Sequence, residues 1–301
     1  MNVFIIGATG HIGSHVAKLL AEQKHVITGF VRNKQSAKKL QALGYQTHQG
    51  DIENIADLAE AALAADATVF VPQLMLEEEY NTVAALLAAY ENTGKTFIFT
   101  SGTGVLGQMT DGNWSEDSFA EHDPFTPRKS IARRVDTENL VLNAANKGIR
   151  AMVARPPMIW GGGKYPAIDL LVESIRQKNA ACYIGNGLNL YSHVHVDDLA
   201  ALYGLMIEKG VAGALYHCVC GELSNRCLAE FVAQYCQCKT ASISIDEAID
   251  IWGKFSTLIV QAASSRSKSP RARQELGWAP RHFDLIDAIQ RGDFTALQAL
   301  K

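Results

Sequence analysis

The amino-terminal segment constrains the fold of this chain most strongly. Val3–Ile6 form a run of apolar residues that favour a strand, three glycines with the spacing G-x-x-G-x-x-G follow, and a helical pattern begins at once. Glycines at this spacing allow a tight turn, the approach of a pyrophosphate to the main chain and close packing of strand and helix. The first N–H groups of the helix then point at the anion. We therefore predict a dinucleotide phosphate site made by Gly7, Thr9, Gly10, His11, Ile12 and Gly13.

Composition limits the class of protein. The chain has 301 residues, of which 48% are hydrophobic, and a net charge of -3. This is enough for a large core, and there is no basic surplus for binding nucleic acid. No apolar run approaches the roughly 20 residues of a membrane span, and Met1 leads directly into the first apolar run. We expect a cytoplasmic protein that acts on a small molecule, without a membrane or nucleic-acid partner.

Short apolar runs alternate with helical patterns through the first half of the chain. Runs without polar interruption are typical of parallel strands that are covered on both faces. The predicted strands are Val3–Ile6, His25–Val31, Gln46–Gln49, Thr68–Val71, Thr96–Thr100 and Ala151–Ala154. The helices between them imply right-handed crossovers. We therefore predict an α/β fold of the Rossmann type, with a doubly wound parallel sheet of about seven strands.

Two long segments interrupt this alternation. Residues 102–127 are polar, Gly-rich and acidic, and residues 156–189 contain three consecutive glycines. Loops of this length at the carboxyl edge of a parallel sheet usually shape a site. After about Gly221 the alternation fades. We predict a dinucleotide-binding domain over residues 1–155, to which residues 190–220 return, and a small substrate lobe from residues 156–189 and 221–301.

The ends of the next strands predict the coenzyme. Arg32 ends the second strand, where an acidic residue favours NAD and an arginine pairs with the 2′-phosphate of NADP. No Asp or Glu stands at this position, so we predict NADP, with NAD as the less favoured alternative. Asp51 follows the third strand and either accepts a hydrogen bond from adenine or caps the next helix. Ile52, Val71, Pro72 and Pro156 are further predicted coenzyme contacts.

Motifs along nearly the whole chain resemble the extended or atypical short-chain dehydrogenase/reductases, the NAD(P)-dependent epimerases and dehydratases. Besides the glycine motif, they are Gly50-Asp51, Thr100-Ser101-Gly102, Arg155-Pro156-Pro157, Trp160-Gly161, the segment from Val194 to Ala200, and the segment from Leu276 to Pro280. The resemblance implies a Rossmann domain, a small carboxyl-terminal substrate lobe and often a homodimer.

One departure from the family pattern bears on catalysis. The family usually carries Tyr-x-x-x-Lys, with Glu four residues after the Lys. Aligning that Glu with Glu138 places Ser130 at the tyrosine and Arg134 at the lysine. No Tyr stands between Gly102 and Gly148. The resemblance makes Ser101, Ser130 and Arg134 the candidate catalytic residues, and Arg134 also a coenzyme contact. A serine cannot replace tyrosine unaided, because its hydroxyl has a far higher pKa.

Other chemistry-bearing residues have two interpretations each. Tyr165, Tyr183 and Tyr191 are either substitute proton donors or wall residues of the substrate pocket. His193 and His195, with Asp197 and Asp198, are either metal ligands or, as the resemblance implies, structural residues, with Asp198 capping the next helix. The Cys218/Cys220 and Cys236/Cys238 pairs are too closely spaced for a typical zinc site. We favour the structural interpretation and predict no metal.

The sequence supports two classes of function. The first is an NADP-dependent oxidoreductase that transfers hydride to or from a small carbonyl compound or similar metabolite, with the coenzyme supplying the hydride chemistry. The second is a non-catalytic NADP(H)-binding redox sensor, which the missing tyrosine supports. A nucleotide-sugar epimerase or dehydratase agrees less well, since these reactions rely on the tyrosine.

Overall fold

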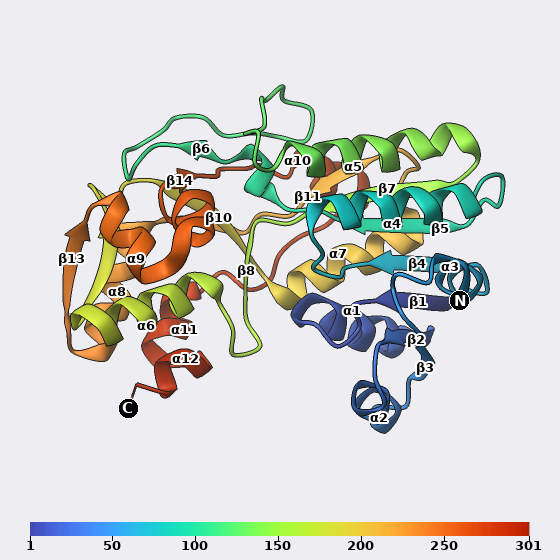
Figure 1. Ribbon diagram of the computed structural model, residues 1–301, viewed down its shortest axis with the longest axis horizontal. Coiled ribbons are helices and arrows are strands. Elements are labelled where there is room, and N and C mark those ends of the chain that lie inside the picture. Colours follow the sequence, from blue (N-terminus) through green and yellow to red (C-terminus); the bar gives the residue numbers. More distant parts are fainter. Residues whose placement is uncertain (301) are drawn as a thin grey trace.

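A parallel sheet of seven strands forms the centre of the molecule (Figure 1). The computed structural model describes residues 1–300. Along the sheet the strand order is β11-β7-β5-β4-β1-β2-β3. The strands are β1 (Asn2–Ile6), β2 (Val26–Val31), β3 (Gln46–Gln49), β4 (Ala67–Phe70), β5 (Thr96–Thr100), β7 (Arg150–Arg155) and β11 (Leu215–His217). The predicted fold class is confirmed, and the six predicted strands lie within one residue of the observed bounds at each end.

Helices cover both faces of this sheet, which explains why its strands are mostly apolar; the edge strand β3 is polar and only partly buried. One face carries α1 (His11–Glu22), α2 (Lys34–Ala42), α7 (Val196–Lys209) and α10 (Pro270–Leu276). The other face carries α3 (Ile55–Leu63), α4 (Leu76–Ala89) and α5 (Ala132–Asn143), with the short η2 (Ala144–Lys147) after α5. Each face has its own apolar core, so both sets of strand side chains are removed from water.

The remaining elements, which we call the outer elements, lie mainly to one side of the sheet (Figure 1). A three-stranded sheet has the order β12-β10-β8, and two pairs of strands join β13 to β9 and β14 to β6. The strands are β6 (Gln108–Met109), β8 (Met158–Trp160), β9 (Ala180–Ile184), β10 (Leu190–His195), β12 (Gly221–Ser224), β13 (Lys239–Ile243) and β14 (Ala263–Ser264). The helices are η1 (Thr103–Leu106), α6 (Pro166–Lys178), α8 (Asn225–Cys236), α9 (Ile245–Phe255), η3 (Ser256–Gln261), α11 (Leu285–Arg291) and α12 (Thr295–Gln298).

The outer elements have apolar cores of their own, one around α6, α8 and α11 and one around α9 and β13. The boundaries at residues 155, 189 and 221 stay predictions. None of the described helices is long and apolar enough to cross a membrane.

Candidate coenzyme and active site

The turn between β1 and α1 is built as a phosphate-binding loop. Gly7 has a φ of +98°, and a Cβ atom there would lie 2.8 Å from the carbonyl oxygen of Val71. A Cβ on Gly13 would lie 2.2 Å from the carbonyl oxygen of Gly7. A side chain at Gly7 would therefore collide with the main chain after β4, and one at Gly13 would force α1 away from the end of β1. The Gly10 N–H donates to the Gly7 carbonyl at 2.9 Å and closes the turn.

The first turn of α1 has no side chain that accepts hydrogen bonds from its free main-chain N–H groups. Its N-cap is Gly10, which provides no side-chain hydrogen bond, and the first turn holds no acidic residue. Thr9 and His11 lie at this turn, and His11 Nε2 lies 2.9 Å from the Gly161 carbonyl oxygen. Ile12 packs against the core instead. The uncapped N–H groups and the positive end of the helix dipole together favour an anion at this place.

Arg32 and Asp51 lie beside one another at the same edge of the sheet. β2 pairs with β3 so that Val31 lies opposite Gln49, and the Gly50 N–H donates to the Val31 carbonyl at 3.1 Å. Arg32 is exposed and has no carboxylate partner in the described structure. This leaves its guanidinium available to an anion in solution.

Asp51 does not cap α3, so that alternative is wrong. Its Oδ1 accepts from the Glu53 N–H at 3.1 Å and shapes the loop, whereas Asn54 caps the helix and accepts from Asp57. Ile52 is buried in the apolar core below the loop. A depression of about 430 Å³ beside Ile52 is lined in part by Glu78 and Thr82 of α4.

Four residues predicted to line the nicotinamide end of the coenzyme site lie at the ends of neighbouring strands. Val71 and Pro72 follow β4 and lie so close to Gly7 that a Cβ atom on Gly7 would be 2.8 Å from the Val71 carbonyl oxygen and 3.0 Å from the Pro72 nitrogen. The Ser101 N–H after β5 donates to the Ala154 carbonyl at 2.8 Å, and the Thr103 N–H donates to the Pro156 carbonyl at 2.9 Å. The Ser101 hydroxyl is buried and has no hydrogen-bond partner in the described structure.

Ser130 and Arg134 are placed differently from one another. Ser130 is exposed in the turn before α5, two residues ahead of its first residue. Arg134 lies on α5, and its Nε and Nη2 donate to the two carboxylate oxygens of Glu79 on α4 at 3.0 and 2.8 Å. Glu79 is only 1% exposed, and its burial raises the pKa of its carboxyl group. The two-donor edge of Arg134 thus has a protein partner already.

The family follows from the extent of the sequence match. The sequence model of the NAD dependent epimerase/dehydratase family matches residues 3–219, which is well over half of the chain. The chain belongs to this family.

Similar proteins share this fold but differ in activity. An uncharacterized protein of Schizosaccharomyces pombe is 29% identical over 296 residues, covering 95% of this chain and 97% of that protein. A 4-hydroxy-2-methyl-3-oxo-4-farnesyl-3,4-dihydroquinoline-1-oxide ketoreductase of Stigmatella aurantiaca is 27% identical over 229 residues, or 72% and 67% of the two chains. The crystal structure of a dTDP-glucose 4,6-dehydratase from Streptomyces venezuelae with NAD bound has a TM-score of 0.78 at 19% identity, covering 97% and 96%. At that identity the likeness concerns the fold alone.

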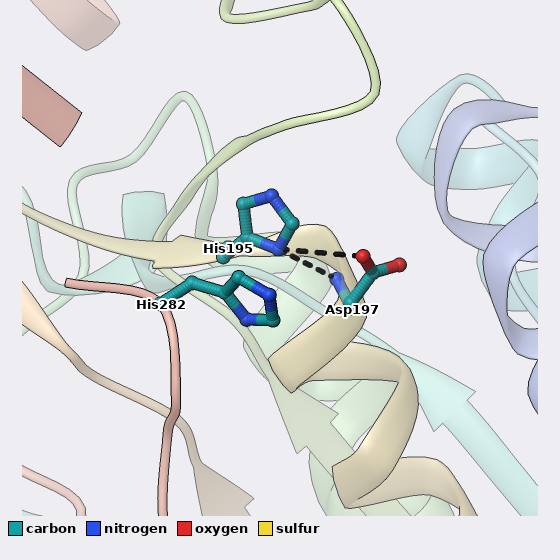
Figure 2. A group of neighbouring side chains, drawn as sticks. All are labelled: His195, Asp197 and His282. Carbon is teal, nitrogen blue, oxygen red and sulfur yellow. Dashed lines mark hydrogen bonds and ion pairs between the residues drawn. The ribbon is translucent and has the colours of Figure 1, made fainter. Parts of the chain in front are cut away.

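Within this family fold, three chemistry-bearing side chains gather at the start of α7, as Figure 2 shows for His195, Asp197 and His282. His195 is the N-cap of α7, and its Nδ1 accepts from the Asp197 N–H at 3.2 Å. The rings of His195 and His282 stack with 4.1 Å between their centroids. Burial, with His282 beside it, lowers the pKa of His195 to about 4, so the ring is neutral at pH 7.

The arrangement in Figure 2 agrees better with a structural role than with a metal site. The planes of the His195 and His282 rings differ by only 21°. The nitrogen lone pairs lie in these nearly parallel planes, and so they do not point at one common metal position. The capping bond uses His195 Nδ1, and His282 Nδ1 lies 3.1 Å from a carboxylate oxygen of Asp198. That no metal binds stays a prediction.

Asp198 does not cap α7, so the sequence interpretation of this residue is wrong. Its carboxylate accepts from the N–H groups of Arg281 and His282, both at 2.9 Å, and its main-chain carbonyl accepts from Trp278 Nε1 at 2.8 Å. It thereby fastens the carboxyl-terminal segment to the start of α7. Sequence reasoning missed His282, because only the fold brings it to His195.

The three candidate tyrosines also lie in different surroundings. Tyr165 and Tyr183 are buried in the core of the outer elements, so they are wall or core residues. Tyr191 is half-buried, and its hydroxyl lies close to those of Ser265 and Thr103 and to the guanidinium of Arg128. A cation thus lies beside the Tyr191 hydroxyl, whereas at Tyr183 the guanidinium of Arg226 lies over the ring, 5.7 Å from its centroid. Arg128 was not among the predicted site residues, since no motif marks it.

Proposed function

We propose that this chain is an NADP-dependent oxidoreductase that transfers hydride between the coenzyme and a small carbonyl compound. The observation that carries the proposal is the turn at Gly7 and Gly13, whose close contacts leave no room for a side chain beside an uncapped helix start. The residues there fit the pyrophosphate of a dinucleotide. When bound, the coenzyme supplies the hydride chemistry, and the protein orients substrate and coenzyme.

Arg32 supports NADP over NAD. It is an exposed cation that follows β2, and no acidic residue stands there to accept from the hydroxyls of an adenosine ribose. NAD remains the alternative coenzyme, because the similar dehydratase structure was obtained with NAD. Asp51 on the adjacent loop is the nearest predicted acidic contact, at the adenine end of the track.

Replacing Arg32 by Ala is expected to weaken NADPH binding by about 1–3 kcal/mol and to leave NADH binding nearly unchanged. The reason is that only NADPH carries the 2′-phosphate with which the guanidinium pairs. Calorimetric titration with both coenzymes measures this difference. Lys39→Ala, in the last turn of α2, removes a cation at a distance from the end of β2 and serves as control. An equal loss for both coenzymes would refute the role assigned to Arg32.

On the substrate side, the buried hydroxyls of Ser101 and of Thr103, two residues on, have no hydrogen-bond partner within residues 1–300, and Ser101 stands at the strand end. We infer that it donates a hydrogen bond to the substrate oxygen next to the nicotinamide. Arg134 does not offer Nε and Nη2 to the substrate, because both nitrogens donate to the carboxylate of Glu79. Ser130 is exposed and lies in the turn before α5.

A redox sensor is the second candidate, and the Arg134–Glu79 pair favours it. Arg134 aligns with the family lysine and is already paired with Glu79, and Ser130 stands at the tyrosine position. The two candidates differ in whether bound NADPH is oxidised. We expect the protein to oxidise NADPH with at least one member of a panel of aldehydes, ketones and oxo acids. Tight NADPH binding without oxidation by any member would favour the sensor.

A further inference from the structure

Arg128 is a half-buried arginine that has no carboxylate partner in the described structure and whose guanidinium keeps two nitrogens without a hydrogen-bond partner. Its Nη1 donates to the Leu258 carbonyl in η3 at 2.7 Å. Its Nε and Nη2 are buried and have no hydrogen-bond partner. Within residues 1–300 no carboxylate lies within ion-pair distance of it, although burial lowers its pKa and thus works against the charged form.

Four other arginines show what usually binds the Nε and Nη2 edge of the guanidinium in this chain. Nε and Nη2 face the two oxygens of one glutamate in four pairs, namely Arg133–Glu77, Arg134–Glu79, Arg155–Glu138 and Arg266–Glu222. This side-on arrangement matches the geometry of a carboxylate and is the stronger form of the ion pair. Arg128 has the same edge without the carboxylate. Leaving charged donors buried and unpaired is costly, so their presence indicates a partner from outside the chain.

The surroundings of Arg128 lie on the predicted substrate side. A Cβ on Gly107 would lie 3.8 Å from Nη2, and one on Gly104 would lie 3.7 Å from the Tyr191 hydroxyl oxygen. Both glycines belong to the stretch that begins with Ser101, and the first residue of η1, Thr103, is bonded to Pro156. Arg128 Nη2 thus lies beside Gly107, which follows η1 in the same stretch as Ser101, and the Ser101 hydroxyl also lacks a hydrogen-bond partner in the part of the chain that the structure describes.

Tyr191 adds a second donor beside the cation. Its hydroxyl lies near Ser265 and Thr103, and burial raises the pKa of its phenol, which therefore stays protonated at neutral pH. Arg128 is the cation that acts on this phenol. A protonated phenol beside a guanidinium can donate to an anion that the guanidinium binds.

We propose that Arg128, through Nε and Nη2, binds a carboxylate group of the substrate, with the Tyr191 hydroxyl as an additional donor. This inference rests on the proposed function and narrows it: the substrate is a carbonyl compound that carries a carboxylate. The carboxylate supplies the partner that the glutamates supply to the other arginines.

A purely structural role for Arg128 makes a different prediction. The bond from Nη1 to Leu258 could tie the loop before α5 to η3. A lysine can make one such bond to a carbonyl but has no planar two-donor edge. Arg128→Lys therefore separates a tie between segments from carboxylate recognition.

The test is calorimetric titration with acetate, oxalate and benzoate, each compared with its neutral amide. It is run on the protein with and without NADP⁺, so that a failure of coenzyme binding, which bears on the proposed function, is seen separately. We expect at least one carboxylate to bind better than its amide. Arg128→Gln and Arg128→Lys should each weaken that binding about tenfold or more, and Tyr191→Phe should weaken it less.

Lys129→Gln, the exposed neighbouring cation, is the matched control and should leave carboxylate binding unchanged. The proposal is overturned if no carboxylate binds better than its amide, or if Arg128→Lys binds the carboxylate as well as the unmodified protein does. Thermal unfolding of each variant shows whether it is folded. Should Arg128→Gln unfold, Arg128→Lys and Tyr191→Phe still decide the matter.

Discussion

Replacing Glu138 by Gln is expected to lower the free energy of unfolding by about 3–5 kcal/mol, because it leaves a buried arginine without its counter-charge. Glu138 is 1% exposed and Arg155 is 4% exposed, and both carboxylate oxygens pair with the guanidinium, one of them with Nε at 2.9 Å. Glutamine keeps the shape of the side chain but not its charge. Urea unfolding followed by fluorescence measures the loss.

The chain supplies a matched control for this prediction. Arg133 pairs with Glu77 through the same two nitrogens at 2.9 and 2.8 Å, but the Glu77 side chain is 67% exposed. Exposed ion pairs contribute about 0–1 kcal/mol, so Glu77→Gln should change stability by no more than that. Equal effects of the two substitutions would show that burial does not determine the importance of the Glu138–Arg155 pair.

Acid is expected to destabilise the fold below about pH 6.5 through histidines that are buried in their neutral form. Burial and the neighbouring Arg155 lower the pKa of His217 to about 3. Burial also lowers the pKa of His193 and of His195 to about 4. His217 Nδ1 donates to the Lys268 carbonyl at 2.9 Å, so Nε2, 3.2 Å from Arg155 Nη1, carries no proton.

The sign follows from the lowered pKa values. Above the unfolded pKa of 6.5 the folded and unfolded states bind the same number of protons at these rings, and their stability contribution is complete. Between pH 6.5 and the folded pKa values the unfolded chain binds the additional protons, so stability decreases as the pH is lowered. Each histidine contributes a slope of about 1.4 kcal/mol per pH unit, and at pH 5 each has lost about 2 kcal/mol.

Unfolding in urea between pH 7 and pH 4.5 measures this dependence. His217→Gln should flatten the curve of unfolding free energy against pH by about 1.4 kcal/mol per pH unit, whatever its effect at pH 7. His122→Gln is the control, since it removes an exposed imidazole. Parallel curves for His217→Gln and the unmodified protein would contradict the assignment of His217 as a buried neutral ring.

Local patterns were sufficient to predict the central sheet and the phosphate loop. Strands such as β1 and β4 are buried on both faces, so hydrophobicity alone marks them along the chain. Gly13 is required by contacts with Gly7 and Ala8 in the same turn, and Gly7 has a φ of +98° there, so the spacing of the two glycines carries the information. The start of α5 was harder, because no side chain provides its cap.

Pairs that join distant segments could not be predicted in the same way. Glu79 resembles any acidic residue in the first turn of a helix, and only the packing of α4 against α5 brings it to Arg134, 55 residues away. His282 meets Asp198 across 84 residues. Arg128 is distinguished by the absence of a carboxylate partner among the described residues of the fold, and no sequence pattern indicates such an absence.

Titration of the purified protein with NADPH and NADH tests the central claim, that coenzyme phosphates lie over the start of α1. We predict saturable binding, on the order of micromolar, for at least one of the two coenzymes. Gly10→Asp should abolish it while preserving the fold, because an aspartate at the N-cap satisfies the helix N–H groups and repels phosphate. Absence of heat with both coenzymes, or unchanged binding by Gly10→Asp, would contradict the account.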